Sequence, residues 1–333
     1  MLKIGLVGAG FMGITHAHAF AKAPDTQIVM VASRTAVKAA AVAKEVDAEA
    51  TTDFMAVVKD PGVDAVSITL PTNMHKEYVL AALNAGKHVL IEKPMALSVA
   101  ECDDMIEAAQ QSGQILMVAQ VLRFWPEYIA MIDFIHAGQL GKPLAAVASR
   151  LCEPPRWGEW FLNPEWTGGE VLDLHIHDLD AFNWFFGTPR SVYARGQKGE
   201  PGGWDYVQSL VDYGGVCCSG EGSALQPAHY PFTMTLKVLC ERGAVEFQMR
   251  AGGGQVDSFD AGTNSLIVYE TGKDPCKLSV VPGDAYERQA AYFVECIHEK
   301  KLPSRGAPEQ GRLAVATALA ARQSIETGQV VTL

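Results

Sequence analysis

The first 120 residues alternate short apolar runs with amphipathic stretches, and this alternation constrains the fold more than any other feature of the chain. Uninterrupted apolar runs are typical of strands buried on both faces, and the stretches between them have helical periodicity. Repeated strand–helix–strand order predicts right-handed crossovers and a parallel sheet. Strands are expected at 2–8, 28–33, 63–70, 87–92 and 114–120, and helices at about 11–23, 35–46, 73–85 and 98–112.

Glycines mark the first turn of this pattern. Gly8, Gly10 and Gly13 have the spacing G-x-G-x-x-G, directly after an expected strand and at the start of a helix. There the first glycine permits a tight turn, the second lets a pyrophosphate approach the backbone, and the third lets the helix pack close to the strand. Helix N-terminal amides then face the phosphates. The turn therefore predicts a dinucleotide site, with a glycine-rich turn that binds nothing as the alternative.

The end of the second expected strand bears on which dinucleotide binds. NAD sites usually place Asp or Glu here to accept hydrogen bonds from the ribose 2′-hydroxyl, but this chain has Ser33 followed by Arg34. No carboxylate would repel a 2′-phosphate, and the Arg34 guanidinium could bind one. We therefore expect NADP(H) in preference to NAD(H). The alternative for Arg34 is a solvated residue at a helix start.

A lysine follows the strand expected at 87–92. The tripeptide Glu92-Lys93-Pro94 stands at the carboxyl end of that strand, the edge at which doubly wound sheets bind ligands. Pro94 disfavours helix at the preceding residue, so Lys93 is expected on a fixed extended turn. The tripeptide alone is equally typical of a surface turn, and its position is what makes Lys93 a candidate.

Length and composition limit the classes of protein. A chain of 333 residues favours two domains, and its net charge of −11 argues against a general nucleic-acid binder. No apolar run reaches the roughly 18–20 residues that a membrane-spanning helix needs. Seven cysteines, an odd number without a C-x-x-C pair, fit reduced thiols better than disulfides. Strand-like sequence begins at Leu2, which leaves no room for a signal peptide, and we expect a cytoplasmic protein.

The second half of the chain has a different pattern. After a helical stretch at 124–138, strand-like segments dominate from about 142 to 281. Their period-two alternation predicts an antiparallel sheet with one covered face. Strands are expected at 143–151, 206–213, 216–224, 232–240 and 243–249, and closing helices at about 284–299 and 308–327.

Aspartates and histidines are concentrated in GGEVLDLHIHDLDAF (168–182). On a regular helix, Asp173, His177 and Asp180 share one face beside an apolar stripe. His175 falls within that stripe, far from His177, so the two cannot chelate one ion, and no metal is expected. We expect His175 to be a hydrogen-bonded core histidine. From this pattern alone, the Asp173/His177 face is as consistent with solvation as with catalysis.

These motifs together resemble the glucose–fructose oxidoreductase/inositol dehydrogenase/rhizopine-catabolism (Gfo/Idh/MocA) family over nearly the whole chain. The resemblance implies an α/β fold with an N-terminal Rossmann domain, a doubly wound parallel sheet, over 1–121. It also implies a C-terminal α+β domain over 122–333 with a large, open, mostly antiparallel sheet. The motifs are GLVGAGFMG (5–13), PTNMHKEYVLAALNAGKHVLIEKPMA (71–96), RFWP (123–126), GGEVLDLHIHDLD (168–180) and the C-terminal ALAARQSIETGQVVTL.

The activity that the resemblance implies is hydride transfer between a nicotinamide cofactor and a carbinol or ketone carbon of a sugar, inositol or related polyol. His177 would carry the proton, because histidine titrates near neutral pH. Asp173 would orient His177, and Lys93 would stabilise negative charge on the reacting oxygen and share the proton relay. Cofactor contacts are expected from Gly8, Gly10, Phe11, Met12, Gly13, Ser33, Arg34, Pro71, Thr72, Asn73, His75, Glu92, Lys93 and Gln120, and substrate contacts from Lys93, Arg123, Trp157, Asp173 and His177.

Two other functions compete with this one. A non-catalytic regulator could keep the dinucleotide site alone, although the presence of Lys93, Asp173 and His177 argues against it. A glycosidase could use bound NAD for a transient oxidation. The tryptophan-rich stretch at 154–169 is consistent either with sugar binding or with a packed or interface loop. The family resemblance further implies a homodimer or homotetramer.

Overall fold

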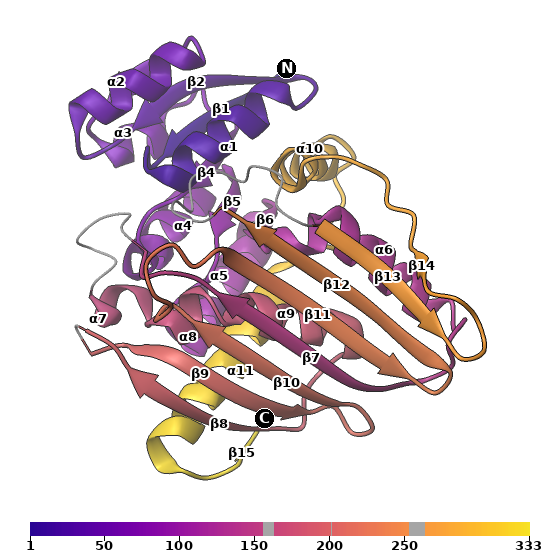
Figure 1. The fold of residues 1–333 in the computed structure, drawn as a ribbon. Helices are drawn as coiled ribbons and strands as arrows, with labels where there is room; N and C mark the ends of the chain where they lie inside the picture. The colour runs from indigo at the N-terminus through magenta and orange to yellow at the C-terminus, as the bar shows by residue number, and fades with distance from the viewer. Residues whose placement is uncertain (156–162, 201, 253–263) are drawn as a thin grey trace. The chain divides into compact units, whose positions relative to one another are not determined.

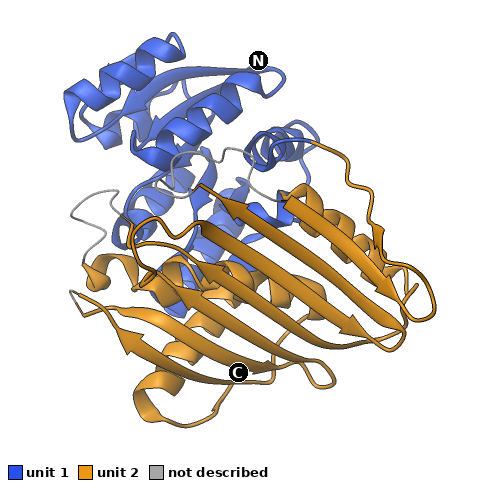
Figure 2. Cartoon of the chain, viewed as in Figure 1, with its two compact units in different colours: residues 1–124, 283–312 blue, residues 125–282, 313–333 orange. Residues whose placement is uncertain are grey.

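The computed structural model describes residues 1–155, 163–200, 202–252 and 264–333. The chain divides into two compact units (Figure 2): the first comprises Met1–Phe124 with Gly283–Arg312, and the second comprises Trp125–Pro282 with Leu313–Leu333. We expected the second domain to run unbroken from residue 122, but residues 283–312 form part of the first unit. None of the described helices combines the length and apolar character needed to cross a bilayer.

The first unit is built on a parallel sheet (Figure 1). The strand order is β3-β2-β1-β4-β5-β6, and the direction of winding reverses between β1 and β4. Ligands of doubly wound sheets bind beyond the carboxyl ends of the strands at such a reversal. The strands are β1 (Leu2–Val7), β2 (Thr26–Ala32), β3 (Glu49–Thr51), β4 (Ala65–Ile68), β5 (His88–Glu92) and β6 (Leu116–Ala119).

One helix between the strands has a recognisable start signal and a recognisable stop signal. Ser98 accepts a hydrogen bond from the Glu101 amide at the start of α5 (Val99–Ser112), and Gly113 ends that helix in the left-handed region. The other helical segments before residue 125 are α1 (Phe11–Lys22), α2 (Ala36–Glu45), α3 (Phe54–Lys59), η1 (Thr72–Met74), α4 (His75–Asn84) and η2 (Val121–Phe124).

Residues 283–312 join the first unit through both backbone and side-chain contacts. The Val118 amide of β6 donates to the Gly306 carbonyl oxygen at 2.7 Å. On α10 (Ala285–His298), the Phe293 ring meets the Phe20 ring of α1 edge-on, with centroids 6.3 Å apart. This segment therefore completes the packing around β6 and α1, which explains why the first unit is discontinuous in sequence.

The second unit contains a large mixed sheet of order β14-β13-β12-β11-β7-β10-β9-β8-β15 (Figure 1). Its neighbours pair antiparallel except β7 and β10, which are parallel. The expected α/β fold with a mostly antiparallel second sheet is thus confirmed. The strands are β7 (Pro143–Leu151), β8 (Ser191–Lys198), β9 (Trp204–Asp212), β10 (Cys217–Ser223), β11 (Phe232–Cys240), β12 (Gly243–Ala251), β13 (Asn264–Glu270), β14 (Cys276–Lys277) and β15 (Val331–Thr332).

Helices cover one face of this sheet. The rings of Tyr128 on α6 and Phe247 on β12 are in edge contact, and Ser324 on α11 accepts a hydrogen bond from the Ala194 amide of β8. Two of the helices are also joined to each other, since the Asn183 side chain of α9 donates a hydrogen bond to the Thr317 hydroxyl of α11. The helices are α6 (Pro126–His136), α7 (Pro164–Thr167), α8 (Glu170–Asp173), α9 (Ile176–Phe186) and α11 (Pro308–Thr327).

A buried ion pair fastens α9 to the sheet. Arg150 of β7 donates from Nε and Nη2 to the two carboxylate oxygens of Asp178, at 3.1 and 3.0 Å. Both side chains are buried. Removing one partner of such a pair is costly, because the other charge stays in the interior without compensation.

We therefore expect Asp178→Asn to lower the free energy of unfolding, measured by urea titration, by about 3 kcal/mol or more. The exposed pair Asp103–Arg312 provides the control. Asp103→Asn should cost less than about 1 kcal/mol, because water screens that pair. Similar losses in the two variants would contradict a special role for the buried pair.

Candidate functional site

The strands of the parallel sheet end together at one edge. Their pairing aligns Val7 with Ile68, Ile68 with Ile91, and Ile91 with Val118. The segments that follow these strands therefore emerge side by side within the first unit. The residues predicted to bind the cofactor lie in those segments, at the turn after β1, the ends of β2 and β4, the turn after β5 and the end of β6.

The glycine turn after β1 is tightly packed at two of its three glycines. Gly8 has a φ of +116°, and a Cβ there would lie 2.7 Å from the Thr69 carbonyl oxygen. A Cβ on Gly13 would strike the carbonyl oxygen of Gly8, so α1 can approach β1 this closely only without a side chain. Gly10, the N-cap of α1, has nothing within 4 Å of an ideal Cβ and has an ordinary φ of −84°.

This arrangement fits a dinucleotide. The fold gives no internal reason for glycine at position 10, so the open space beside it is what an approaching pyrophosphate requires. A second observation lies at the end of β6, where the buried Gln120 amide nitrogen has no hydrogen-bond partner among the described residues. The N-terminal amides of α1 would hold the phosphates, and Gln120 retains a donor for a bound ligand.

The other predicted cofactor residues differ in exposure. Ser33 and Thr72 are buried, whereas Arg34 and Asn73 are exposed. Ser33 and Arg34 are the first two residues after β2. Phe11, Met12 and Pro71 are half-buried.

Glu92 belongs to a buried hydrogen-bond chain. One carboxylate oxygen lies 3.0 Å from His16 Nε2, and the other accepts from the Lys93 amide at 3.0 Å. His16 Nδ1 lies 2.7 Å from the Ser67 hydroxyl on β4. The sequence does not single out His16 and Ser67, because the two partners of His16, Ser67 and Glu92, lie 51 and 76 positions away. The available signal was a histidine on the buried side of α1.

His75 also holds the turn after β5. Its Nδ1 lies 3.0 Å from the Pro94 carbonyl oxygen, and its Nε2 lies 2.8 Å from the Leu70 carbonyl oxygen. Burial lowers the pKa of His75, which favours the neutral ring with a single N–H donor. Since both ring nitrogens face backbone carbonyls, His75 is placed to position this turn rather than to contact a cofactor through its ring.

The segment predicted as one helix over the Asp173 region is interrupted. It consists of α8 and α9, and Leu174 and His175 between them form a turn. The amides of Leu174 and His175 both donate to the Glu170 carbonyl oxygen, at 2.9 and 2.8 Å. The expected face of Asp173, His177 and Asp180 is therefore wrong in detail, since Asp180 is buried.

Solvent access singles out two residues of this segment. From Val171 to Asn183, all side chains are buried except Asp173 and His177, which are half-buried. Asp173 ends α8, and His177 lies in the first turn of α9. These are the two residues that we predicted to be catalytic here, and the structure leaves both side chains partly exposed.

His175 packs into the sheet beneath them. Its Nε2 lies 2.8 Å from the Ser209 hydroxyl of β9. Side chains on Gly220 or Gly222 of β10 would come within 2.7 Å and 2.9 Å of His175 atoms, so these two glycines make room for the ring. Burial, and to a lesser extent the Arg150 charge, lowers the pKa of His175 to about 4. The histidine is a neutral core residue, as expected.

The structure does not support solvent access for two of the predicted substrate residues. Arg123 in η2 is only 2% exposed, and Trp157 lies outside the described residues. Among the described residues, no group of three His, Cys, Asp or Glu side chains is placed to hold a metal ion.

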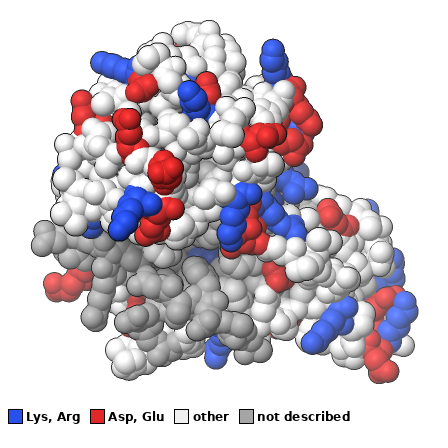
Figure 3. Space-filling model, turned by 90° about the horizontal axis from the view of Figure 1, so that it is seen from above, with Lys and Arg blue, Asp and Glu red and all other residues white. Residues whose placement is uncertain are grey.

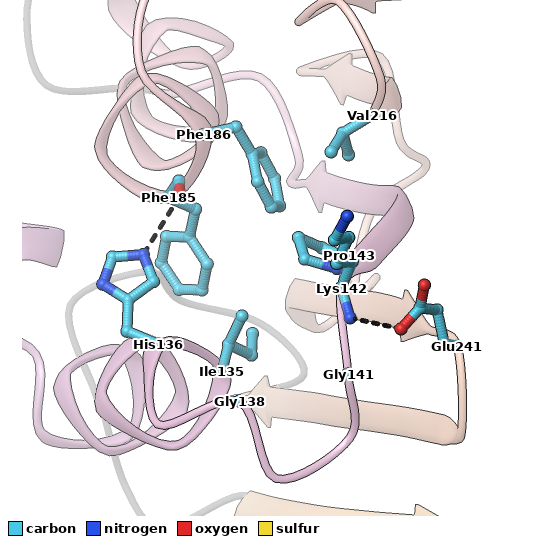
Figure 4. Close-up of a pocket in the computed structure, with 10 residues that line it drawn as sticks. All are labelled: Ile135, His136, Gly138, Gly141, Lys142, Pro143, Phe185, Phe186, Val216 and Glu241. Atoms are coloured by element: carbon cyan, nitrogen blue, oxygen red, sulfur yellow. Dashed lines mark hydrogen bonds between the residues drawn. The ribbon is translucent and has the colours of Figure 1, made fainter.

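The second unit contains a pocket of about 550 Å³ (Figure 4). Phe185, Phe186 and Ile135 form its apolar wall, and Lys142 and Glu241 lie at one side. None of the predicted site residues lines it. On the face of the molecule in Figure 3, acidic and basic side chains are interspersed.

The glycine geometry predicts opposite consequences for two similar substitutions. Gly10→Ala should leave the melting temperature of the free protein unchanged to within about 2 °C but weaken NADPH binding about tenfold or more, because the new methyl group occupies the ligand's space. Gly13→Ala should itself destabilise the protein by about 2 kcal/mol. Fluorescence titration and thermal melts measure both effects. Unchanged NADPH affinity in Gly10→Ala would refute the assigned position of the dinucleotide.

His175 predicts a pH effect on stability. Its folded pKa of about 4 lies below the unfolded value of 6.5, so the unfolded state binds the proton more readily. Neutral His175 therefore contributes fully to the free energy of unfolding above pH 6.5, and this contribution is lost as the pH falls toward 4. Between about pH 7.5 and pH 5, the wild type should lose about 2 kcal/mol more unfolding free energy than His175→Gln. Parallel pH profiles would contradict this assignment.

Comparison with known proteins identifies relatives of the whole chain. The chain is 29% identical to 1,5-anhydro-D-fructose reductase of Ensifer adhaerens, over 99% of this chain and 98% of the relative. It is 27% identical to scyllo-inositol 2-dehydrogenase (NADP(+)) IolU of Bacillus subtilis (strain 168), over 91% and 90%. A crystal structure of aldose-aldose oxidoreductase from Caulobacter crescentus, complexed with glycerol, shares the fold with a TM-score of 0.86 at 22% identity, covering 100% and 99% of the two chains.

Family models match both parts of the chain. Residues 2–120 match the oxidoreductase family with an NAD-binding Rossmann fold, and residues 128–246 match the GFO/IDH/MocA C-terminal domain. The resemblance seen in the sequence motifs is thereby confirmed, and the chain belongs to the Gfo/Idh/MocA family of oxidoreductases.

Proposed function

We propose that the protein is an NAD(P)-dependent dehydrogenase or reductase that acts on a carbinol or ketone carbon of a sugar, inositol or related polyol. The observation that carries this proposal is the exposure pattern of 171–183, where Asp173 and His177 alone have solvent access in an otherwise buried segment. The full-length relatives, a sugar reductase and an inositol dehydrogenase, support the class of substrate.

Lys93 stabilises charge on the reacting oxygen. It follows β5 at the carboxyl edge of the dinucleotide-type sheet, on a turn that buried groups hold in place. When bound beside this lysine, a nicotinamide would supply or accept the hydride. An ammonium group that hydrogen-bonds the substrate oxygen stabilises the negative charge that develops there, and it can share the transfer of the hydroxyl proton.

His177 carries the proton, and Asp173 orients it. Oxidation of a carbinol releases a proton from the hydroxyl group, and reduction requires its return. An imidazole with solvent access can exchange that proton with water near neutral pH. A carboxylate at the end of α8, one turn earlier in the chain, favours one orientation of the ring and stabilises its cationic form.

NADP(H) is the proposed cofactor, in preference to NAD(H). The end of β2 carries Ser33 and the exposed Arg34 where a carboxylate would discriminate against a 2′-phosphate. An exposed guanidinium can approach a phosphate group in two-point contact. The NADP-dependent inositol dehydrogenase among the relatives supports this preference.

Self-association is proposed through the uncovered face of the large sheet. Partly exposed apolar side chains there include Val147 of β7, Leu210 of β9 and Leu239 of β11. A homodimer or homotetramer would cover these side chains. A monomer mass measured by sedimentation equilibrium would refute self-association. The seven cysteines form no disulfide, which fits the cytoplasm as the proposed location.

Absorbance at 340 nm, with NADPH and NADH against polyols, aldoses and keto-sugars, tests the activity. Lys93→Ala and His177→Ala should each lower turnover about 10²-fold or more, because each removes a group from proton transfer or charge stabilisation. Both variants should retain cofactor affinity to within about threefold. Lys76→Ala is the control, since Lys76 pairs with Asp104 on the surface.

The outcomes separate the proposal from its alternatives. Turnover retained in Lys93→Ala, or cofactor binding lost in it, would refute the assigned role of this lysine. Tight cofactor binding without turnover of any tested compound would favour a regulator or a glycosidase with resident NAD.

A further inference from the structure

The backbone of Lys93 is tied to a helix distant in sequence. The Lys93 amide donates to Glu92 Oε2, and Glu92 Oε1 lies 3.0 Å from His16 Nε2. An ionised carboxylate has only acceptors, so His16 Nε2 carries the hydrogen. In the neutral ring, Nδ1 then accepts from the Ser67 hydroxyl at 2.7 Å. Each of these polar groups has a partner of the correct kind.

The carboxylate cannot turn freely, because it is buried. Glu92, His16 and Ser67 all lie in the interior of the first unit. A buried carboxylate that lost one of its donors would pay the cost of desolvation without compensation. Its orientation is thus set by two donors at once, the imidazole of His16 and the amide of Lys93.

His16 connects two parts of the proposed active site. It lies on α1, whose N-terminus begins at the glycine turn. Glu92 ends β5 directly before Lys93. The chain from Ser67 through His16 to Glu92 therefore links the helix that would hold the pyrophosphate to the turn that carries the lysine. His75 holds the same turn from its other end, at the Pro94 carbonyl.

We propose that His16 is a positioning residue for Lys93, acting through the Glu92 carboxylate. This rests on the proposed catalytic role of Lys93. His16 touches neither substrate nor cofactor in this role. It fixes the direction in which the Lys93 side chain leaves the backbone. A small displacement of a catalytic ammonium group lowers turnover strongly.

Two near-isosteric substitutions separate the contacts of His16. The amide nitrogen of glutamine can take the place of Nε2 and keep the donor to Glu92. The amide of asparagine can take the place of Nδ1 and keep only the contact to Ser67. His16→Gln should therefore preserve the position of Lys93, and His16→Asn should release it.

Hydrogen exchange measures the position directly in the cofactor-saturated enzyme. A peptide of residues 91–95 reports only the Lys93 and Met95 amides, because Pro94 has none and the first two amides lose their label. Exchange of this peptide should be about tenfold faster in His16→Asn than in the wild type, and nearly unchanged in His16→Gln. If His16→Asn does not fold, His16→Met replaces it, because methionine fills a similar volume and offers no donor to Glu92.

Steady-state kinetics with NADPH and a substrate from the panel give the second readout. His16→Asn should lower kcat about tenfold or more, with KM and the NADPH Kd within about threefold, and His16→Gln should restore most of kcat. His18→Ala, an exposed site on the same helix, controls for the helix. Val58→Ala, a buried site on α3, controls for a general loss of packing.

The outcomes distinguish this inference from the proposed function. Equal exchange in wild type, His16→Gln and His16→Asn overturns the positioning role, as does faster exchange in His16→Asn with unchanged kcat. If Lys93→Ala keeps its turnover, the proposed catalytic role of Lys93 falls, and the exchange of the Lys93 amide in the His16 variants still decides whether His16 holds the turn.

Discussion

The close approach of α1 to β1 sets the geometry of the first unit. The Gly13 position touches the Gly8 carbonyl oxygen, and that contact leaves no volume for a side chain. The approach fixes where α1 begins, and with it the direction of the free amides at the carboxyl edge of the sheet. It also carries His16, one turn further along α1, to the buried ends of β4 and β5. The glycine turn and the turn that carries Lys93 are thus held by one helix.

The second unit relies on a different kind of constraint. Its accessible pair, Asp173 and His177, lies at a break between two helices, where a regular hydrogen-bond ladder does not define the backbone. Two neighbours supply the definition instead. His175 fits a recess over the glycines of β10, and Asp178 is held by Arg150 of β7. The buried contacts of His175 and Asp178 therefore determine where Asp173 and His177 lie.

Local pattern was sufficient for most elements and insufficient for contacts between distant ones. Strands β7 and β11 have the predicted bounds, because period-two alternation is a property of neighbouring residues. The break at Leu174–His175 was missed, since helical periodicity continues across it. The helix predicted at about 284–299 has an ordinary pattern, and the place of residues 283–312 in the first unit depends on contacts with Phe20 and Val118. The His16–Glu92 contact likewise arises only from the fold. The roles proposed for Lys93, Asp173 and His177 came from family motifs, because periodicity alone leaves them undecided.

The burial of Val171–Asn183 has a consequence for how this scaffold can diverge. Eleven of its thirteen side chains are interior, so nearly every replacement on this stretch also disturbs packing. The two accessible positions are the ones that the chemistry would hold constant. Substitutions within this segment can therefore rarely change which ligand the protein recognises. A change of specificity would have to come from surface segments elsewhere in the chain, where substitutions do not disturb the packing of the core.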